Sequence, residues 1–455
     1  MPHEYLNNRV ALNEITDVAS FDKKKTMLVW DFNDLIELFN KCNIKMIITD
    51  KIETKLEEEN TYYTFPSGSS PLILKARINN NLYYFQSIQG LFKASPRDME
   101  IKYKKYSLED YIEILDKEGI AISIASAFFK PFIKKYPNFL SIGFNDQIIQ
   151  YESELMTQIT AGGYLYCPEE SKKAYCYDDY CYDENSLYPY LASYFKIPYG
   201  EPLVCQINTR KLDCVYFYKV DIEAKGKDDC LPLMLSKIYE EDPNINKYVS
   251  GIHKDIWLTD KEIDYLKAHY KFETEIKYHV ILEFNTVPNN IIKDYLEPEL
   301  KRKEELPDGI LRWISKQKVN TFVGRIGYKF GKHNYSHNCF MHRYIIGLGR
   351  AVLCEIGTEI KHRGYEVRYC DTDSIHTNMP VEEFSKVFNF DNIKIGCFKL
   401  ENHFRVARYY AFKNYAGEDY DSGEIIVKAA GIEKGSEDRI RIQKEFVKGL
   451  ELIGG

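Results

Sequence analysis

Two aspartates one residue apart, Asp371 and Asp373, are the residues of this chain best suited to chemistry. They lie in the segment 369–374 (Tyr-Cys-Asp-Thr-Asp-Ser), which is typical of a tight hairpin. Two carboxylates this close repel each other unless a cation lies between them, and hard divalent cations such as Mg²⁺ prefer oxygen ligands. Two such ions about 3.5–4 Å apart activate an attacking oxygen and stabilise a leaving phosphate. The alternative is an ordinary surface turn.

A third carboxylate stands upstream, at the end of an aromatic stretch. The segment 183–189 reads Asp-Glu-Asn-Ser-Leu-Tyr-Pro. Pro189 cannot continue a central strand, so we expect a strand that ends at Asp183 and a turn that opens at Ser186. With the later hairpin, this segment predicts a two-metal site. Its expected metal ligands are Asp183, Glu184 and Asp373, and the backbone carbonyl of Glu184 is expected to face a triphosphate.

These segments resemble the motifs of family-B DNA polymerases, specifically the protein-primed branch found in small tailed phages. Residues 183–189 are similar to motif A of that family and residues 369–374 to motif C. Lys413-Asn414-Tyr415 matches its K-x-Y motif, and residues 316–324 (Lys-Gln-Lys-Val-Asn-Thr-Phe-Val-Gly) are similar to its motif B, K-x-x-x-N-S-x-Y-G. The resemblance runs from about Tyr106 to Lys448.

The resemblance implies an α+β right-hand polymerase fold of palm, fingers and short thumb, preceded by a degenerate ribonuclease-H-like exonuclease domain. The expected division is an exonuclease-like domain at 1–160, palm at 161–203 and 331–430, an insertion at 204–298, fingers at 299–330 and thumb at 431–455. The insertion resembles the region that contacts a priming terminal protein. It is the main reason to expect protein priming, and a terminal protein as partner, rather than nucleic-acid priming.

The resemblance also assigns roles to side chains. Asp183, Asp371 and Asp373 are the expected catalytic residues, with two Mg²⁺ ions (Mn²⁺ is an alternative) and with Asp371 in supporting contact. Residues expected to bind the incoming deoxynucleoside triphosphate are Leu187, Tyr188, Arg312, Lys316 and Asn320, Tyr188 lying under the sugar to exclude a 2′-hydroxyl. Residues expected to bind the DNA primer-template are Gly162, Gly163, Lys413 and Tyr415.

Spacing gives independent support to part of this assignment. Arg312, Lys316 and Asn320 recur every four residues, so a helix would place them on one face. Such a basic stripe suits triphosphate oxygens, although a solvated helix face is the alternative. Lys413 and Tyr415 alternate, so a strand would place both on the side of the primer terminus.

The chain departs from the family at several places, and each departure carries an expectation. No D-x-E motif stands near the N-terminus, and of the exonuclease motifs only a Tyr-x-x-x-Asp is present, at Tyr106 and Asp110. We therefore expect no proofreading. Val323 replaces the motif B tyrosine, which puts nucleotide selection in question. The interval between motifs B and C holds only a small loop, Gly327–His337, before a helix at Met341–Glu359, which predicts weak strand displacement and low processivity.

Composition is that of a globular enzyme. The chain has 455 residues, a net charge of −7 and eleven cysteines without regular spacing, which indicate reduced thiols. Negative net charge argues weakly against nucleic-acid binding, but local basic grooves rather than total charge set affinity for DNA. The absence of a signal peptide and of a long apolar run predicts no membrane association and a location in the host-cell cytoplasm.

Two other functions remain open at the level of sequence. The chain could be a polymerase relic that binds DNA or a partner without chemistry, which the missing exonuclease residues and Val323 favour. The close carboxylates argue against a relic, since like charges together cost stability. The third possibility is a nucleotidyltransferase that extends without a template.

Overall fold

The structure, a computed structural model, divides into two compact units, Met1–Pro131 and Phe132–Gly455. It describes residues 9–11, 26–29, 32–48, 61–64, 73–78, 81–87, 108–120, 124–141, 143–158, 162–206, 209–237, 246–288, 290–307, 309–327, 329–330, 335–336, 338–430 and 437–453. The boundary between the units lies inside helix α5 (Ile124–Lys135).

The first unit contains a six-stranded mixed sheet with the order β1-β2-β6-β5-β4-β3. Its elements are β1 (Arg9–Ala11), β2 (Thr26–Val29), α1 (Phe32–Lys41), β3 (Lys45–Ile48), β4 (Thr61–Thr64), β5 (Ile73–Ile78), β6 (Asn81–Ser87) and α4 (Leu108–Lys117). The alternating residues from Leu72 to Phe85 predict a strand pair, and the antiparallel pairing of β5 with β6 confirms it.

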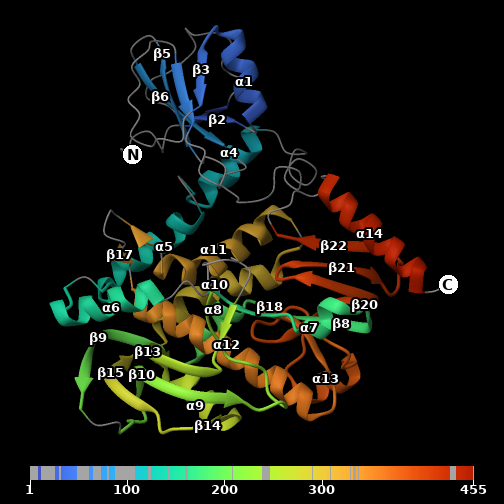
Figure 1. Ribbon diagram of the computed structural model, residues 1–455. Helices are drawn as coiled ribbons and strands as arrows, with labels where there is room; N and C mark the ends of the chain where they lie inside the picture. The colour runs from blue at the N-terminus through green and yellow to red at the C-terminus, as the bar shows by residue number, and fades with distance from the viewer. Residues whose placement is uncertain are drawn as a thin grey trace. The chain divides into compact units, whose positions relative to one another are not determined.

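Seven antiparallel strands of the second unit form the sheet that carries the motif aspartates, here called the palm sheet (Figure 1). Its order is β22-β21-β20-β8-β19-β18-β7. The strands are β7 (Tyr164–Tyr166), β8 (Cys176–Glu184), β18 (Val367–Thr372), β19 (Ser374–Thr377), β20 (Phe398–Ala411), β21 (Asn414–Asp419) and β22 (Ile425–Ala429). Strand β8 therefore lies between β20 and the β18–β19 hairpin, although β8 and the hairpin are far apart in the sequence.

A second antiparallel sheet occupies the region expected to be an insertion. Its order is β13-β10-β15-β9, and β14 also pairs with β10. The elements are β9 (Pro198–Cys205), β10 (Cys214–Gly226), β13 (Gly251–Thr259), α9 (Asp260–His269), β14 (Tyr270–Phe272) and β15 (Lys277–Thr286), and a separate pair is formed by β11 (Met234–Lys237) and β12 (Asn246–Tyr248). We call the four strands with β14 the insertion sheet.

Helix α12 (Cys339–His362) connects the two sheets of this unit. It packs against β7 and β18 of the palm sheet and against β9 and β13 of the insertion sheet (Figure 1). Asn338 caps its first turn by accepting a hydrogen bond from the Met341 amide at 2.9 Å. Lys361 and His362 in its last turn complement the negative end of the helix. Apolar residues on almost every face are typical of a buried helix, and α12 confirms the helix predicted at Met341–Glu359.

A pair of helices spans the region expected to form the fingers. It consists of α10 (Ile291–Glu305) and α11 (Ile310–Ile326), which pack against each other and against α8 (Leu187–Tyr194). A short antiparallel pair, β16 (Lys329–Phe330) with β17 (Tyr335–Ser336), follows in the predicted small loop. The remaining helices are the 3₁₀ turn Pro137–Phe139, α6 (Asp146–Gln158), α7 (Glu169–Lys173), α13 (Val381–Val387) and α14 (Glu437–Ile453).

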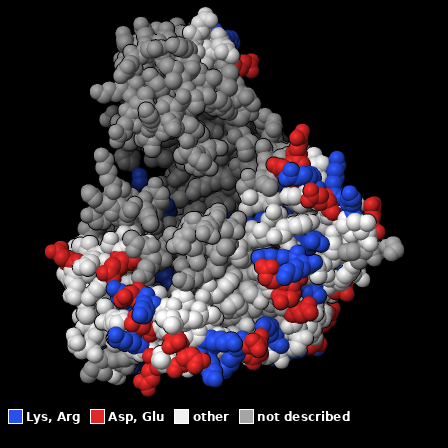
Figure 2. All heavy atoms as spheres, viewed as in Figure 1, with Lys and Arg blue, Asp and Glu red and all other residues white. Residues whose placement is uncertain are grey.

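Charge is mixed over the visible surface of the described residues. On the face shown in Figure 2, acidic and basic side chains are interspersed, and neither sign dominates a broad region. The described residues on this face therefore form no large basic surface. Within the part of the chain that the structure describes, no helix combines the length and the apolar character needed to cross a lipid bilayer.

Candidate active site

Strand pairing brings the motif aspartates together. Asp183 at the end of β8 is paired with Ser374 of β19 on one side and with Lys399 of β20 on the other. Ser374 in turn is paired with Asp371 of β18. Residues paired across neighbouring strands point to the same face of a sheet. The side chains of Lys399, Asp183, Ser374 and Asp371 therefore form one row across the palm sheet.

Asp373 reaches this row from the turn between β18 and β19. Its carbonyl oxygen accepts a hydrogen bond from the Glu184 amide at 2.8 Å, which fixes the turn to the end of β8. Thr372, beside it, has a φ of 65°, in the left-handed region. For a β-branched residue this conformation costs on the order of 1–3 kcal/mol. The Thr372 hydroxyl donates to Asp371 Oδ1 at 2.8 Å, a local bond that offsets part of the cost.

Two carboxyl groups in this site are held in an environment that opposes negative charge. Burial, followed by the charges of Asp183 and Asp371, raises the pKa of Asp373 to about 7. Burial, followed by the charges of Asp373 and Asp183, raises the pKa of Glu184 to about 8. Glu184 is only 3% exposed, and its Oε2 has no hydrogen-bond partner among the described residues. A bound cation would relieve both groups.

Lysines neutralise the two outer aspartates. Lys399 Nζ lies 2.8 Å from Asp183 Oδ2, and Lys413 Nζ lies 2.7 Å from Asp371 Oδ1. All of the carboxylate donors are hard oxygen ligands of the kind that Mg²⁺ prefers, so the residues fit a divalent-cation site. In the side-chain positions of this structure, the carboxylates of the motif aspartates do not form a compact set of three ligands. Among the described residues, three metal-ligating atoms lie within 4.8 Å of one another only at Asp221, Asp255 and His279 on the insertion sheet.

An open cavity of about 470 Å³ lies over this row of side chains. The residues that line it are Asp183, Asp371, Thr372, Asp373, Ser374, Glu401, Lys413, Tyr415, Lys428, Ala429, Ala430 and Arg439. The cavity thus joins the ends of β8 and β18 to the β20–β21 hairpin, β22 and α14. All three predicted catalytic aspartates and both residues of the K-x-Y motif are brought together in it.

The K-x-Y residues occupy different local environments. The sequence predicts that Lys413 and Tyr415 share one face of a strand, but Lys413 lies in the turn between β20 and β21 with a φ of 59°. That part of the prediction is wrong, because the hairpin turns one residue before β21 begins. The Lys413 amide donates to the Tyr369 hydroxyl at 2.5 Å, which fixes the turn next to the motif C strand.

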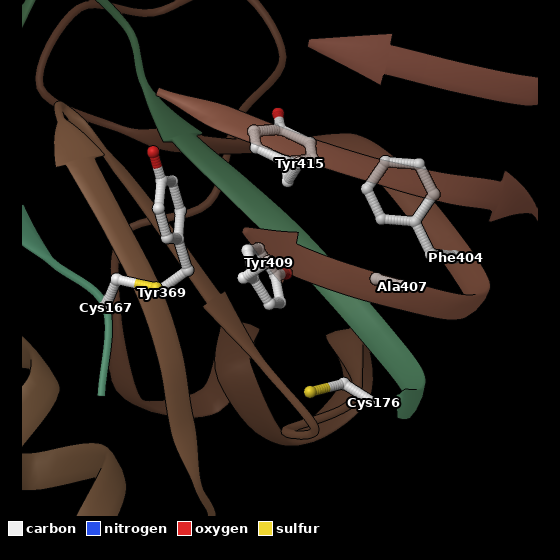
Figure 3. Packing of buried hydrophobic residues seen from close by; sticks show 7 residues of the cluster. All are labelled: Cys167, Cys176, Tyr369, Phe404, Ala407, Tyr409 and Tyr415. Atoms are coloured by element: carbon white, nitrogen blue, oxygen red, sulfur yellow. The ribbon is translucent and has the colours of Figure 1, made fainter. Parts of the chain in front are cut away.

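Tyr415 belongs to an aromatic cluster under the cavity (Figure 3). Tyr369 and Tyr409 are stacked with ring centroids 4.9 Å apart, and Tyr415 packs against Tyr369 at 5.5 Å. The Tyr409 hydroxyl donates to the buried Asp179 and lies 2.7 Å from Nδ1 of His376. This buried network connects β8, β18, β19, β20 and β21, so it holds rigid the strands that carry the aspartates. Tyr415 is only 6% exposed, which leaves little of it for contact with a primer.

The basic stripe predicted on the fingers is present on α11. Lys316 and Asn320 are exposed and Arg312 is half-buried. The Ser186 hydroxyl, in the turn after β8, lies 3.4 Å from Asn320 Oδ1. The positive charge of Lys316 lowers the pKa of Asp373, although burial and the neighbouring carboxylates raise it by more. Lys316 and Asn320 therefore lie near the motif aspartates, and the binding of a triphosphate by this stripe stays a prediction.

A further cation, Lys303 of α10, is one that the sequence did not single out. It is 8% exposed, and its Nζ donates to the Ser186 hydroxyl at 2.9 Å. Burial, followed by the charges of Lys316, Lys399 and Arg312, lowers the pKa of Lys303 to about 8. Four cations thus converge beside the turn after β8, and their mutual repulsion makes this place attractive to a polyanion. Lys303 and Lys399 carry no distinguishing sequence signal, since lysines in charged segments are usually exposed.

The two residues of motif A predicted to contact the nucleotide differ in their accessibility. Leu187 is fully buried at the start of α8, which leaves only its backbone for such a contact. Tyr188 is half-buried, and burial, followed by the charge of Asp373, raises the pKa of its hydroxyl. Gly163, one of the two glycines predicted to touch DNA, lies against the Tyr188 hydroxyl. The Gly162 carbonyl accepts a hydrogen bond from Arg350 of α12 at 3.2 Å.

The exonuclease prediction lies outside the described side chains. Tyr106 precedes the described residues of α4, and the side chain of Asp110 is not described. Val323, at the motif B position of the family's tyrosine, is 2% exposed and packs in the interior of the fingers.

Comparison with known proteins is consistent with this geometry. Residues 100–337, just over half of the chain, match the family described as DNA polymerase type B, organellar and viral. The DNA polymerase of Bacillus phage phi29 is 23% identical over 323 residues, which are 64% of this chain and 52% of that protein. The DNA polymerase of Bacillus phage Nf is 24% identical over 290 residues, 57% of this chain and 49% of that protein. The chain thus spans about half the length of the curated relatives it matches.

Among solved structures, phi29 DNA polymerase complexed with primer-template DNA and incoming nucleotide substrates is similar with a TM-score of 0.68 and 18% identity. The match covers 86% of this chain and 81% of that one. The binary complex of the same polymerase with primer-template DNA gives a TM-score of 0.67. At this identity the likeness concerns the fold, and it confirms the predicted α+β right-hand polymerase fold.

Proposed function

The chain belongs to the type B DNA polymerases of the organellar and viral kind, and on that premise we propose that it catalyses template-directed addition of deoxynucleotides to DNA. The observation that carries the proposal is the meeting of Asp183, Asp371 and Asp373 in one cavity, which Lys413 also lines. The cations Lys303 and Lys316 lie beside that group. The reaction class that needs both features is phosphoryl transfer from a nucleoside triphosphate.

Asp183 and Asp373, with the Glu184 carbonyl, would hold the metal, and Asp371 supports them. Two bound Mg²⁺ ions supply activation of the attacking 3′-hydroxyl and stabilisation of the pyrophosphate leaving group. The raised pKa of Asp373 supports this assignment, because the site favours a proton or a cation at that carboxylate.

The remaining residues bind and orient the substrates. Lys303, Lys316 and Arg312 neutralise the triphosphate, whose charge offsets their mutual repulsion. Tyr188 lies under the sugar of the incoming nucleotide and disfavours a 2′-hydroxyl. Lys413 contacts the phosphates of the primer terminus, which positions the primer without reading its sequence.

The partners that we propose are a DNA primer-template, deoxynucleoside triphosphates and a terminal protein whose hydroxyl starts synthesis. Two similar solved structures are of phi29 DNA polymerase complexed with primer-template DNA, and one of them also with incoming nucleotide substrates. The presence of the insertion sheet at the expected place supports the terminal protein. Proofreading is absent and strand displacement is weak in this proposal.

Primer extension on a defined primed template tests the proposal. With Mg²⁺ and four deoxynucleotides, the wild-type chain should extend the primer according to the template, and chelation of the metal should stop extension. Asp373→Ala should abolish it, whereas Asp421→Ala, which changes an exposed aspartate outside the cavity, should not.

Other outcomes would point to the other functions. DNA binding by the wild-type chain without extension would favour a relic that holds DNA. A product whose sequence ignores the template would favour a template-independent nucleotidyltransferase.

A further inference from the structure

Tyr188 lies against two glycines from distant parts of the chain. A Cβ atom on Gly349 of α12 would stand 2.8 Å from Cε1 of the Tyr188 ring and 3.4 Å from Cδ1 of Leu191. A Cβ atom on Gly163 would stand 2.5 Å from the Tyr188 hydroxyl and 2.7 Å from Cγ2 of Thr372. Real Cβ atoms essentially never have a nonbonded neighbour as close as 2.5–2.8 Å, so a side chain at either position would displace the tyrosine or its neighbours.

Space, rather than backbone conformation, is the reason for glycine at both positions. Neither Gly163 nor Gly349 has a φ in the left-handed region. Gly349 lies in the interior of α12, where alanine is the more favourable residue for helix formation. The glycine that is unfavourable for helix formation therefore stands where the Tyr188 ring touches α12.

Among the described residues, packing contacts set the position of the ring. The Tyr188 hydroxyl is buried and has no hydrogen-bond partner among the described residues. Within the described residues, no hydrogen bond of that hydroxyl therefore opposes a shift of the side chain. The ring is sensitive to a change of one methyl group beside it, because close-packed surroundings transmit such changes.

The same turn of α12 also holds the segment that contains Gly163. Arg350, the residue after Gly349, is completely buried. Its Nη1 donates to the Gly162 carbonyl at 3.2 Å, and its Nη2 donates to Glu262 Oε1 at 2.8 Å. Residues 349–350 therefore touch Tyr188 directly and hold the segment that touches its hydroxyl.

We propose that Gly349 is a positioning residue for sugar selection: its missing side chain allows the Tyr188 ring to stand where it excludes a ribose. The inference rests on the proposed function, in which Tyr188 lies under the sugar. Gly349 contacts no substrate and acts through Tyr188 alone.

Gly349→Ala tests the proposal through the ratio of kcat/KM for a ribonucleotide to kcat/KM for the matching deoxynucleotide. The ratio should rise by about tenfold, at the lower end of what one methylene group is worth in a pocket. Tyr188→Val should raise the same ratio by itself. In the Tyr188→Val background, Gly349→Ala should add nothing, because the atoms that it displaces are gone.

Gly357→Ala is the matched control on the same helix. Its Cβ would stand 2.2 Å from Cδ1 of Leu231, and its nearest neighbours belong to Leu231 and Val367 rather than to Tyr188. It should lower the melting temperature and leave the ratio unchanged. An unchanged ratio in Gly349→Ala, or an equal rise in both backgrounds, would overturn the proposal.

Folding gives a readout that does not depend on activity. If Gly349→Ala alone does not fold, the double variant Tyr188→Val/Gly349→Ala should fold, since the smaller side chain leaves room for the methyl group. Failure of both to fold would count against the proposal. A wild-type chain that does not extend a primer would instead contradict the proposed function. The comparison of folding between Gly349→Ala and the double variant would still report on the contact between Gly349 and Tyr188.

Discussion

At Lys303, burial and three neighbouring cations oppose the positive charge of the side chain. The pKa of Lys303 is lowered from 10.5 to about 8, so between these values the folded chain binds fewer protons than the unfolded chain. Stability must then rise with pH across that window. Below about pH 8 the buried charge costs up to roughly 3 kcal/mol.

Lys303→Met should therefore be more stable than the wild-type chain at pH 7, and the difference should shrink as the pH rises toward 10. Urea unfolding at several pH values measures it. Lys301→Met is the control, because the Lys301 side chain is 72% exposed and its removal should not change the pH dependence. Parallel stability curves for Lys303→Met and the wild-type chain would contradict the prediction.

At the scale of elements, α9 and α12 are joined by a buried ionic group. Glu262 accepts hydrogen bonds from Arg343 at 3.0 Å and from Arg350 at 2.8 Å, and it also caps α9 together with Thr259. The two arginines outweigh the effect of burial and lower the pKa of Glu262 to about 2. This carboxylate is therefore charged at neutral pH, and it compensates two guanidinium groups that water does not reach.

Glu262→Ala should destabilise the second unit by about 3–5 kcal/mol, because both arginines would remain buried without a counter-charge. Chemical denaturation measures the loss. Glu359→Ala on the same α12 removes an exposed ion pair with Arg363 and should cost less than about 1 kcal/mol. A similar loss in both variants would show that the buried group has no special importance.

At the scale of the whole molecule, the elements described in the interval between the fingers and motif C are only the short β16–β17 pair and α12. Little chain is available there to close around DNA or to separate strands. We expect extension to stop within a few nucleotides of a downstream strand, and to continue when that strand is omitted. A gapped template with and without the downstream strand measures this. Unassisted displacement of a long strand would show that another segment supplies the function.

The missing exonuclease motif carries a second prediction at this scale. A primer with a mismatched 3′ end should persist when incubated with the chain and Mg²⁺ in the absence of nucleotides. The control is a correctly paired primer in the same gel assay. The contrary result is a mismatched primer that is still shortened after the chain has been purified again. That result would mean that excision uses residues other than the D-x-E that is missing near the N-terminus.

The sequence by itself determined the chemical identity of the site. Asp183, Asp371, Asp373 and Lys413 lie in short motifs whose residue types and local spacing carry the information, so they could be proposed as site residues without a structure. The strand pair of the first unit, the fingers helices and α12 were likewise predictable, because periodicity and turn residues are local properties. The placement of Lys413 on a strand was wrong, since one residue decides whether a hairpin turn includes it.

Only the tertiary structure decided which other residues join the site. Lys303 and Lys399 look like surface lysines in sequence, and their convergence beside Ser186 depends on the packing of α10 and on the pairing of β20 with β8. Gly163 and Gly349 are separated by most of the second unit along the chain, and nothing local relates them to Tyr188. Contacts between distant segments arise from how sheets and helices pack together. They therefore become visible only when the chain is folded.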